Sequence, residues 1–465
     1  MSRTLLDKIR DSHRITSFAE GDDLLFIDLH LLHEINTPQA FDRLRNRGLT
    51  VRRPDLTLAT VDHNTPTKSA ASLNEDPLLA RQINLLEKNC AEFSIPFRPL
   101  GATGQGITHV IAPEEGRVLP GSSLVCCDSH TTTHGAFAAL AIGIGSSQVE
   151  QVLATQAVAL PKFKSMLVTV EGALNKTVSS KDVALALISQ IGTVGATGHV
   201  IEFQGSAIAS LSMDARMTLC NMAVEAGASA GMIGVDDVTV NYLKQVLKRR
   251  GDAVTAETEA EWRQWVSDDN ASFDKYVKID ATSVFERVTW GTNPAQSIGF
   301  DEQIPANESA IAVRAREYMD VKSGQSLSDI SIEKAFIGSC TNGRIEDLRI
   351  AAHILENRKV HDNVHLVIVP GSSRVRDQAI REGLDKIFMD AGADFRHFAG
   401  CSLCVGLNED RLGAGQRSIS TNNRNFEGRQ GPGARTHVAS PAVVAASAVF
   451  GRIARPLELF AGETQ

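Results

Sequence analysis

Residues 335–343 read Ala-Phe-Ile-Gly-Ser-Cys-Thr-Asn-Gly, an apolar run that passes directly into a polar, glycine-bounded motif. The same succession recurs where Leu58–Val61 precedes Asp62-His63-Asn64, where Leu124–Cys127 precedes Asp128-Ser129-His130, and where Val364–Val369 precedes Pro370-Gly371-Ser372. Short apolar runs bounded by such motifs predict buried β-strands. Because ligands of parallel α/β sheets gather at the carboxyl ends of strands, the polar motifs are candidate site residues.

Helical patterns separate these runs. A strand predicted at Leu24–Ile27 is followed by a helix with Thr37 as N-cap, Pro38 in its first turn and Gly48 past its end. Further helices are predicted from Asp76-Pro77, with apolar residues spaced by three and four, and from Ser440-Pro441 to Gly451. Strands that alternate with helices indicate an α/β chain with mainly parallel sheets.

The chain has 465 residues, which suggests roughly three domains. We expect boundaries near residues 165 and 290, giving domains 1–165, 166–290 and 291–465. Two charged stretches, Lys244–Asn270 and Asp301–Asp329, are expected to form surface helices or connections between domains.

Composition excludes several classes of protein. With 47 basic and 55 acidic residues the net charge is −8, which argues against a broad nucleic-acid surface. No apolar stretch approaches the ~18 residues of a membrane helix. The N-terminal residues lack the apolar region of a signal peptide, so we expect a cytoplasmic protein. Seven cysteines, an odd and sparse count, do not make a disulfide framework.

The placement of three cysteines is the most informative feature of the sequence. Cys401-Ser-Leu-Cys404 is a CxxC motif, and Cys340 follows a predicted strand far upstream. Structural or redox thiols, zinc and an iron–sulfur cluster are all compatible with a CxxC, but three thiolates would leave one iron of a cubane open to substrate. The other cysteines are expected to be small buried hydrophobes: Cys90, Cys126, Cys127 and Cys220.

Histidines accompany carboxylates beside the apolar runs. Asp62 precedes His63, Asp128 lies two residues before His130, and His109 lies near another run. A carboxylate fixes the tautomer of a histidine and raises its basicity, which suits proton transfer. The alternative is a histidine satisfied by loop backbone. His130 and His134 have the spacing of a metal pair but lack the glutamate of HExxH, which disfavours zinc there.

Two arginines, Arg424 and Arg429, lie in the glycine- and amide-rich segment 422–433. Planar guanidinium groups bind carboxylates through two hydrogen bonds, so the segment suits a di- or tricarboxylate. A solvated basic loop is the alternative. Gly101–Gly106 and Gly371–Arg374 are expected to be turns, because neither matches a nucleotide-binding motif.

Taken together, the ordered motifs resemble the aconitase superfamily and, within it, the large subunits of isopropylmalate dehydratases. The resemblance covers nearly the whole chain. It rests on HLLHE (30–34), TPQAF (37–41), VDHN (61–64), VCCDSHTTTHGAF (125–137), MTLCNMAVEAGA (217–228), TWGTNP (289–294), FIGSCTNGRIEDLR (336–349), GCSLC (400–404) and TNNRNFEGRQGPG (421–433).

The resemblance implies three aconitase-type α/β domains around one [4Fe-4S] cluster per subunit, with the cluster cysteines in the third domain. It implies Cys340, Cys401 and Cys404 as cluster ligands. It also assigns substrate contacts to Gln39, Ser129, Arg424 and Arg429, positions near the cluster to Asn221 and Asn423, and catalytic pairs to Asp62 with His63, Asp128 with His109, and Glu225 with His130. The chain departs from the usual motifs at Gly343 and at Val405-Gly406-Leu407.

The implied activity is that of a hydro-lyase of leucine biosynthesis, which isomerises 2-isopropylmalate to 3-isopropylmalate through 2-isopropylmaleate. Alternatives are a homoaconitase-like, citramalate-type or citrate hydro-lyase, an RNA-binding regulator, and an electron-transfer protein, although the last normally has four cysteine ligands. The motifs end with the helix that precedes Ile453–Gln465. The family's fourth, swivelling domain is therefore expected on a separate small subunit, in a heterodimer.

Overall fold

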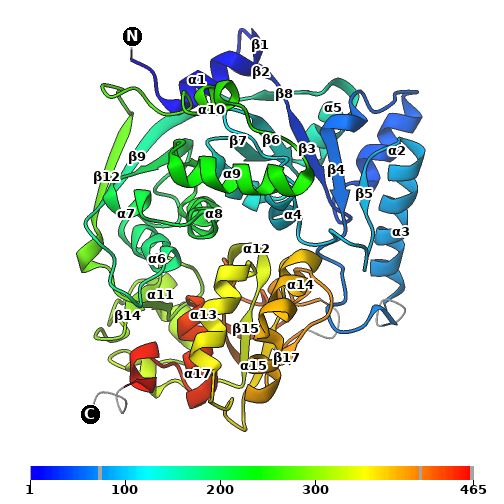
Figure 1. The fold of residues 1–465 in the computed structure, drawn as a ribbon. Coiled ribbons are helices and arrows are strands. Elements are labelled where there is room, and N and C mark those ends of the chain that lie inside the picture. Colours follow the sequence, from blue (N-terminus) through cyan, green and yellow to red (C-terminus); the bar gives the residue numbers. More distant parts are fainter. Residues whose placement is uncertain (1, 72–75, 408–410, 461–465) are drawn as a thin grey trace.

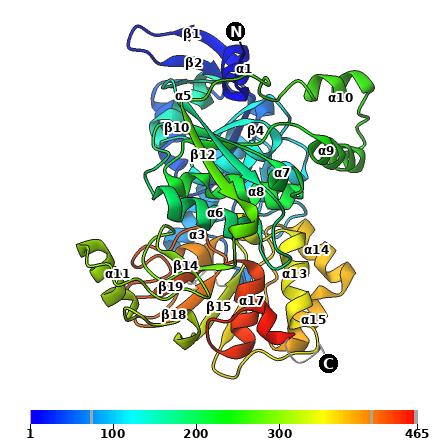
Figure 2. The same ribbon diagram turned by 90° about the vertical axis from the view of Figure 1, so that its left-hand side faces the viewer.

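Three parallel sheets follow one another along the chain (Figure 1). The structure, a computed structural model, describes residues 2–71, 76–407 and 411–460. In two perpendicular views, the part coloured yellow to red lies below the part coloured blue to green (Figures 1 and 2). The predicted α/β class with mainly parallel sheets is confirmed.

The first parallel sheet has the order β5-β4-β3-β6-β7. Its strands are β3 (Leu29–Leu32), β4 (Thr57–Thr60), β5 (Phe97–Arg98), β6 (Ser123–Cys126) and β7 (Leu140–Gly143). Its helices are α2 (Pro38–Asn46), α3 (Pro77–Glu92), α4 (Thr108–Glu114), α5 (Ser146–Thr155) and the 3-10 helices η1 (Pro54–Leu56) and η3 (Ser129–Phe137). Asp76 caps α3, as predicted, by accepting hydrogen bonds from two backbone amides of its first turn.

The strand predicted at Leu24–Ile27 exists as β2 (Asp23–Phe26), but it does not join the parallel sheet. It pairs antiparallel with β1 (Arg14–Ser17), next to α1 (Leu5–His13), and with β8 (Ala157–Leu160). The central strand of the first parallel sheet is β3, which the apolar pattern did not reveal because the buried His30 interrupts it.

The second parallel sheet has the order β11-β10-β9-β12. Its strands are β9 (Lys164–Glu171), β10 (His199–Gln204), β11 (Ala230–Met232) and β12 (Lys275–Asp280). Its helices are α6 (Ser180–Ile191), α7 (Ser206–Ala209), α8 (Met213–Met222), η4 (Ala223–Ala226), α9 (Asp237–Arg250), α10 (Ala256–Trp262) and η5 (Ala281–Ser283). The predicted charged stretch around residue 250 contains the end of α9 and all of α10.

The third parallel sheet has the order β17-β16-β15-β18-β19. Its strands are β15 (Lys334–Ile337), β16 (His365–Ile368), β17 (Asp394–Phe395), β18 (Arg417–Ser420) and β19 (Arg435–Val438). A hairpin of β13 (Arg287–Thr289) and β14 (Ser297–Gly299) precedes it. The helices are α11 (Ala310–Met319), η6 (Leu327–Asp329), α12 (Ser339–Asn342), α13 (Ile345–Leu355), α14 (Ser373–Glu382), α15 (Leu384–Ala391), α16 (Ser402–Val405), α17 (Pro441–Phe450) and η8 (Pro456–Leu459).

Buried side chains form one large core that runs through the first two parallel sheets and their helices, and another around the third sheet. Ile107 and Val110, at the start of α4, belong to the second core although α4 follows a strand of the first sheet. Helix α4 thus joins the two halves of the molecule and carries His109 between them. The predicted boundaries at residues 165 and 290 stay predictions. In the described ranges, no helix is long and apolar enough to cross a membrane.

Candidate active site

Cys340 lies on α12, directly after the central strand β15. The turn between them is tight: Gly338 has φ +158°, and a Cβ there would lie within 2.9 Å of the Phe336 ring and of the Val369 carbonyl. Ser339 follows in the left-handed region with φ 72°, which a residue with a side chain seldom adopts. Such strain next to a candidate ligand points to a functional constraint on how Cys340 is presented.

The other two predicted ligands come from α16. Cys401 precedes this one-turn helix, and Cys404 lies within it. The Cys401 amide donates to the Asp62 carbonyl at 2.7 Å, which fixes the CxxC motif against the first sheet. All three thiols are at most 5% exposed and line one cavity together with Asn423, Arg429 and the paired histidines. The structure thus brings together three cysteines from distant parts of the chain.

Side-chain amides surround the Cys340 sulfur. Asn221 and Asn423 donate to it over 3.3 and 3.4 Å, and Arg429 donates to the Cys404 sulfur over 3.4 Å. A hydrogen bond from the Cys401 thiol, with the positive charges of His130 and His109, lowers the pKa of Cys340 well below its usual value. The site therefore stabilises a thiolate, the form in which cysteine binds metals.

Asp62 and His63 form the first carboxylate–histidine pair through a hydrogen bond to His63 Nδ1. The backbone amide and hydroxyl of Thr108 donate to the other Asp62 oxygen over 3.0 and 2.9 Å. Burial lowers the pKa of His63, but the charge of Asp62 and hydrogen bonds to both neighbouring carboxylates outweigh burial and raise it well above 6.5. The pair therefore holds His63 in its protonated form.

Asp128 lies at the centre of the site, because three histidines face its carboxylate. His63 Nε2, His109 Nε2 and His130 Nδ1 lie 3.3, 3.4 and 3.3 Å from its oxygens. The Asp128 side chain also caps η3 by accepting from the His130 amide at 2.6 Å. The predicted contact between Asp128 and His109 is thus present, but His109 lies on helix α4 and not at a strand end.

His130 also contacts Glu225, whose Oε1 lies 2.9 Å from His130 Nε2. Burial lowers the pKa of His130, but the Cys340 thiolate and the two carboxylates raise it to about 10. His134, the other half of the spacing typical of a metal pair, contacts His109 at 3.0 Å instead. The structure therefore gives the two histidines different partners.

Arg424 reaches the same group from the loop after β18. Its Nε donates to both oxygens of Glu225 over 2.8 and 3.1 Å, and its Nη2 donates to Ser129 Oγ over 2.9 Å. Arg429 lies beside Phe426, and its buried Nε has no hydrogen-bond partner in the described part of the chain. Arg429 lines the cavity, whereas Arg424 contacts Glu225, the partner of the lining residue His130. A guanidinium group at either position can bind a carboxylate.

Two expectations are modified by the structure. Gln39 is exposed on α2 and does not belong to the lining of the cavity. Cys127 is half-buried, unlike the fully buried Cys90, Cys126 and Cys220, and its sulfur lies 3.9 Å from Ser146 Oγ.

The structure also shows supporting residues that had no assigned role. Glu34 accepts the amides of Asp62 and Asn64, and the His33 ring packs at 4.6 Å on the His63 ring. Lys181 is fully buried at the start of α6 and donates to Asn342 and to the carbonyls of Thr421 and Asn422. The motif HLLHE could have indicated His33 and Glu34. Lys181 belongs to no recognised motif, so the sequence did not indicate it.

The donor set fits the [4Fe-4S] cluster that the resemblance implies. Soft thiolates bind iron–sulfur clusters, and N–H groups beside the sulfurs tune their potential. Three thiols line the cavity together with histidines and carboxylates, which can face a substrate. This arrangement leaves one iron of a cubane without a cysteine ligand.

Comparison with known proteins gives a family match and a structural likeness. The sequence profile of the aconitase family (aconitate hydratase) matches residues 7–451. The crystal structure of Thermococcus kodakaraensis aconitase X in its holo form is 13% identical in sequence, with a TM-score of 0.46, and the alignment covers 90% of this chain and 89% of that chain.

Proposed function

This chain belongs to the aconitase family, and we propose that it is the large subunit of a 3-isopropylmalate dehydratase. The reaction is the conversion of 2-isopropylmalate to 3-isopropylmalate through 2-isopropylmaleate, a step of leucine biosynthesis. The observation that carries the proposal is that three buried cysteines line one cavity with three histidines, each of which is paired with a carboxylate. The choice among related 2-hydroxy acids rests on the resemblance of the motifs.

Cys340, Cys401 and Cys404 would hold the [4Fe-4S] cluster. When bound, the cluster supplies an open iron that acts as a Lewis acid towards the substrate hydroxyl. Asn221 and Asn423 keep the Cys340 sulfur in place by hydrogen bonds, and Arg429 does the same for Cys404.

Arg424 binds and orients a substrate carboxylate. Its side chain is 29% exposed, whereas its partner Glu225 is only 8% exposed, so a substrate can reach the guanidinium group while Glu225 holds it in place. Ser129 lies beside the same group and can donate to the second carboxylate oxygen. Two N–H donors in a fixed plane give the orientation that stereospecific removal of water requires.

Two histidines act as proton donors to the hydroxyl group that leaves the substrate. His63, held protonated between Asp62 and Asp128, and His130, held protonated between Asp128 and Glu225, can each donate a proton to a departing hydroxyl. Their carboxylate partners keep each ring in one orientation. The proton that leaves the carbon atom α to the carboxylate goes to a base that this proposal places on the small subunit. Rehydration uses the same groups in the reverse direction.

A small subunit completes the site in this proposal. Support comes from the resemblance to dehydratase large subunits and from the open side of the site, where His63 and Asp128 keep side-chain exposures of 14% and 16%. Closure by a second polypeptide would exclude water from these groups and strengthen their electrostatic interactions.

The experiment is anaerobic reconstitution of the cluster-loaded chain with an isopropylmalate dehydratase small subunit. We expect 2-isopropylmalate to be converted faster than homoaconitate, citramalate or citrate, and no turnover by the large chain alone. Preference for another of these acids would overturn the substrate assignment. Full activity of the chain alone would overturn the partner assignment.

A further inference from the structure

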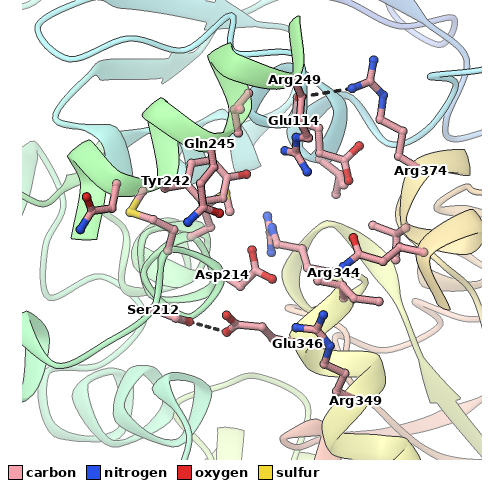
Figure 3. Close-up of a pocket in the computed structure, with 18 of the residues that line it drawn as sticks. Glu114, Ser212, Asp214, Tyr242, Gln245, Arg249, Arg344, Glu346, Arg349 and Arg374 are labelled. Carbon is pink, nitrogen blue, oxygen red and sulfur yellow. Dashed lines mark hydrogen bonds between the residues drawn. The ribbon is translucent and has the colours of Figure 1, made fainter. Parts of the chain in front are cut away.

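A second cavity, of about 440 Å³, lies outside the candidate active site (Figure 3). Its walls come from α4, α8, α9, α13 and α14, so all three predicted domains contribute to it. Glu114, Asp214, Arg249, Arg344 and Arg374 lie around it, and none of its lining residues belongs to the active-site set. Small-molecule sites have volumes of about 300–1,000 Å³ and are frequent at domain interfaces.

Arg344 is the most informative residue of this cavity. Its side chain is almost fully buried, and its Nη1 donates to the Thr341 carbonyl over 2.9 Å. The Nε and Nη2 atoms have no hydrogen-bond partner in the described ranges. Figure 3 shows this guanidinium end directed into the middle of the cavity. Nε and Nη2 form the edge that binds a carboxylate through two parallel hydrogen bonds, and a buried cation with unused donors calls for such a ligand.

The charges around the cavity favour a ligand that carries both a negative and a positive group. Arg249, Arg344 and Arg374 face three carboxyl groups, those of Glu114, Asp214 and Glu346. A fourth arginine, Arg349, is already engaged by both oxygens of Glu382, at 2.8 and 2.6 Å. An ammonium group beside Glu114 and Asp214 favours their ionised form, and the remaining charges then balance. A molecule with one negative and one positive group therefore fits the cavity better than phosphate does.

Two of the carboxyl groups lack a close cationic partner. Burial raises the pKa of Asp214 and the pKa of Glu114 to about 7 each, and nearby arginines only partly offset this effect. Glu114 accepts from Ser372 at one oxygen, while its other oxygen, Oε2, is buried without a partner in the described structure. These groups are therefore acceptors for an ammonium group.

The rest of the lining is largely aliphatic or thioether: Val110, Met213, Met217, Val238, Val246, Ile345 and Val375. We propose that this cavity binds a free α-amino acid with an aliphatic side chain. Its carboxylate lies on Nε and Nη2 of Arg344, its ammonium group faces Asp214 and Glu114, and its side chain contacts the apolar wall. Such a ligand would contact helices from all three predicted domains. Its carboxylate would lie on Arg344, which follows Cys340 by four residues in the chain.

The test is isothermal titration calorimetry of the full chain with L-leucine, L-valine, L-malate and inorganic phosphate. We expect one equivalent of L-leucine or L-valine to bind. Arg344→Gln should weaken binding at least tenfold, because it removes the charged pair of donors. Gln245→Trp, on the exposed part of the α9 wall, should block the cavity without touching Arg344.

Three control variants should bind normally. Arg349→Gln removes an arginine that Glu382 already occupies, Lys248→Trp places the same bulky ring on α9 outside the lining, and Arg424→Ala disables the candidate active site. Because Arg424 is in the other site, its variant separates this proposal from the proposed function. If Arg344→Gln fails to fold, amino-acid binding by Gln245→Trp is the test of the proposal. The proposal is overturned if neither amino acid binds, if phosphate or malate binds as tightly, or if Gln245→Trp leaves binding unchanged.

Discussion

Arg424 shows most clearly how single residues organise the site. It bonds Glu225 through Nε and Ser129 through Nη2, so it depends on the planar shape of its guanidinium group as well as on its charge. Arg424→Lys keeps the charge but cannot make both contacts, and we expect kcat/KM to fall about tenfold or more. Iron content should not change, since Arg424 has no contact with the cysteines.

The matched control is Arg314→Lys, because Arg314 makes an equally regular pair with Glu427 on the surface. Steady-state kinetics of the reconstituted enzyme provide the comparison. An equal decrease in kcat/KM in both variants, or no decrease in Arg424→Lys, would show that Arg424 is a solvated loop residue.

Single residues of the site could be predicted from the sequence where they are neighbours in the chain or belong to a known motif. Asp62 and His63 are neighbours in the chain, and the cysteines belong to recognisable motifs. The contact between His109 and Asp128 and the donation by Lys181 depend on how separate elements pack, which no local pattern encodes. The family resemblance predicted the contact between His109 and Asp128. Nothing in the sequence predicted the hydrogen bonds that Lys181 donates.

At the scale of elements, α6 stabilises the loops that carry the site. Lys181, in its first turn, donates to Asn342 after β15 and to the carbonyls of Thr421 and Asn422 after β18. Lys181→Met preserves the approximate volume but leaves buried acceptors unsatisfied, so we expect unfolding to become easier by about 2 kcal/mol. Denaturant unfolding of the wild type, of this variant and of the exposed Lys176→Met provides the measurement. A loss no greater than that of Lys176→Met would contradict the role of Lys181.

Helix α1 is held by a pair that responds to pH. His13 Nε2 lies 2.6 Å from Asp28 Oδ2. Burial lowers the pKa of His13, but the hydrogen bonds to Asp28 and to the Ile9 carbonyl, with the charge of Asp28, together outweigh burial and raise that pKa above 6.5. Burial raises the pKa of Asp28, but the bond to His13, the charge of His13 and hydrogen bonds from Ser123 together lower it below 3.8. The histidine's stabilising contribution is complete below pH 6.5 and is lost as pH rises through its folded-state pKa. The aspartate's contribution is present above pH 3.8 and is lost as pH falls through its folded-state pKa.

We therefore expect the pair to be strongest between pH 3.8 and 6.5. Its coupling should be about 0.5 kcal/mol, because Asp28 is partly exposed to solvent. A double-mutant cycle of His13→Phe and Asp28→Asn, with unfolding measured at pH 5.5 and pH 8.5, isolates this coupling. Coupling that is equal at both pH values, or larger at pH 8.5, would contradict the account.

Elements with an uninterrupted apolar run and clear caps were predictable, as α3 and β15 show. Strand β3 was not, because the buried His30 interrupts its pattern and only its pairing with β4 and β6 identifies it. The antiparallel partners of β2 lie on either side of the first parallel sheet in the sequence, so local pattern could not reveal them.

At the scale of the whole molecule, the candidate site exists because α4 and the loops after β15 and β18 meet between two cores. The three cysteines, their amide donors and the histidine–carboxylate pairs come from segments more than 300 residues apart. The class of the fold followed from the alternation of strands and helices. Only the family resemblance predicted that these segments form one site, because packing between distant segments produces no periodic pattern in the sequence.

The central claim is that Cys340, Cys401 and Cys404 hold a four-iron cluster with one iron that lacks a cysteine ligand. The most direct measurement is iron and sulfide analysis of anaerobically purified protein, with electron paramagnetic resonance before and after mild oxidation. We predict about four irons per chain, conversion to a three-iron form on oxidation, and loss of the cluster in Cys340→Ser, Cys401→Ser and Cys404→Ser but not in Cys90→Ser. A colourless, fully active protein, or a cluster that survives all three substitutions, would contradict the account.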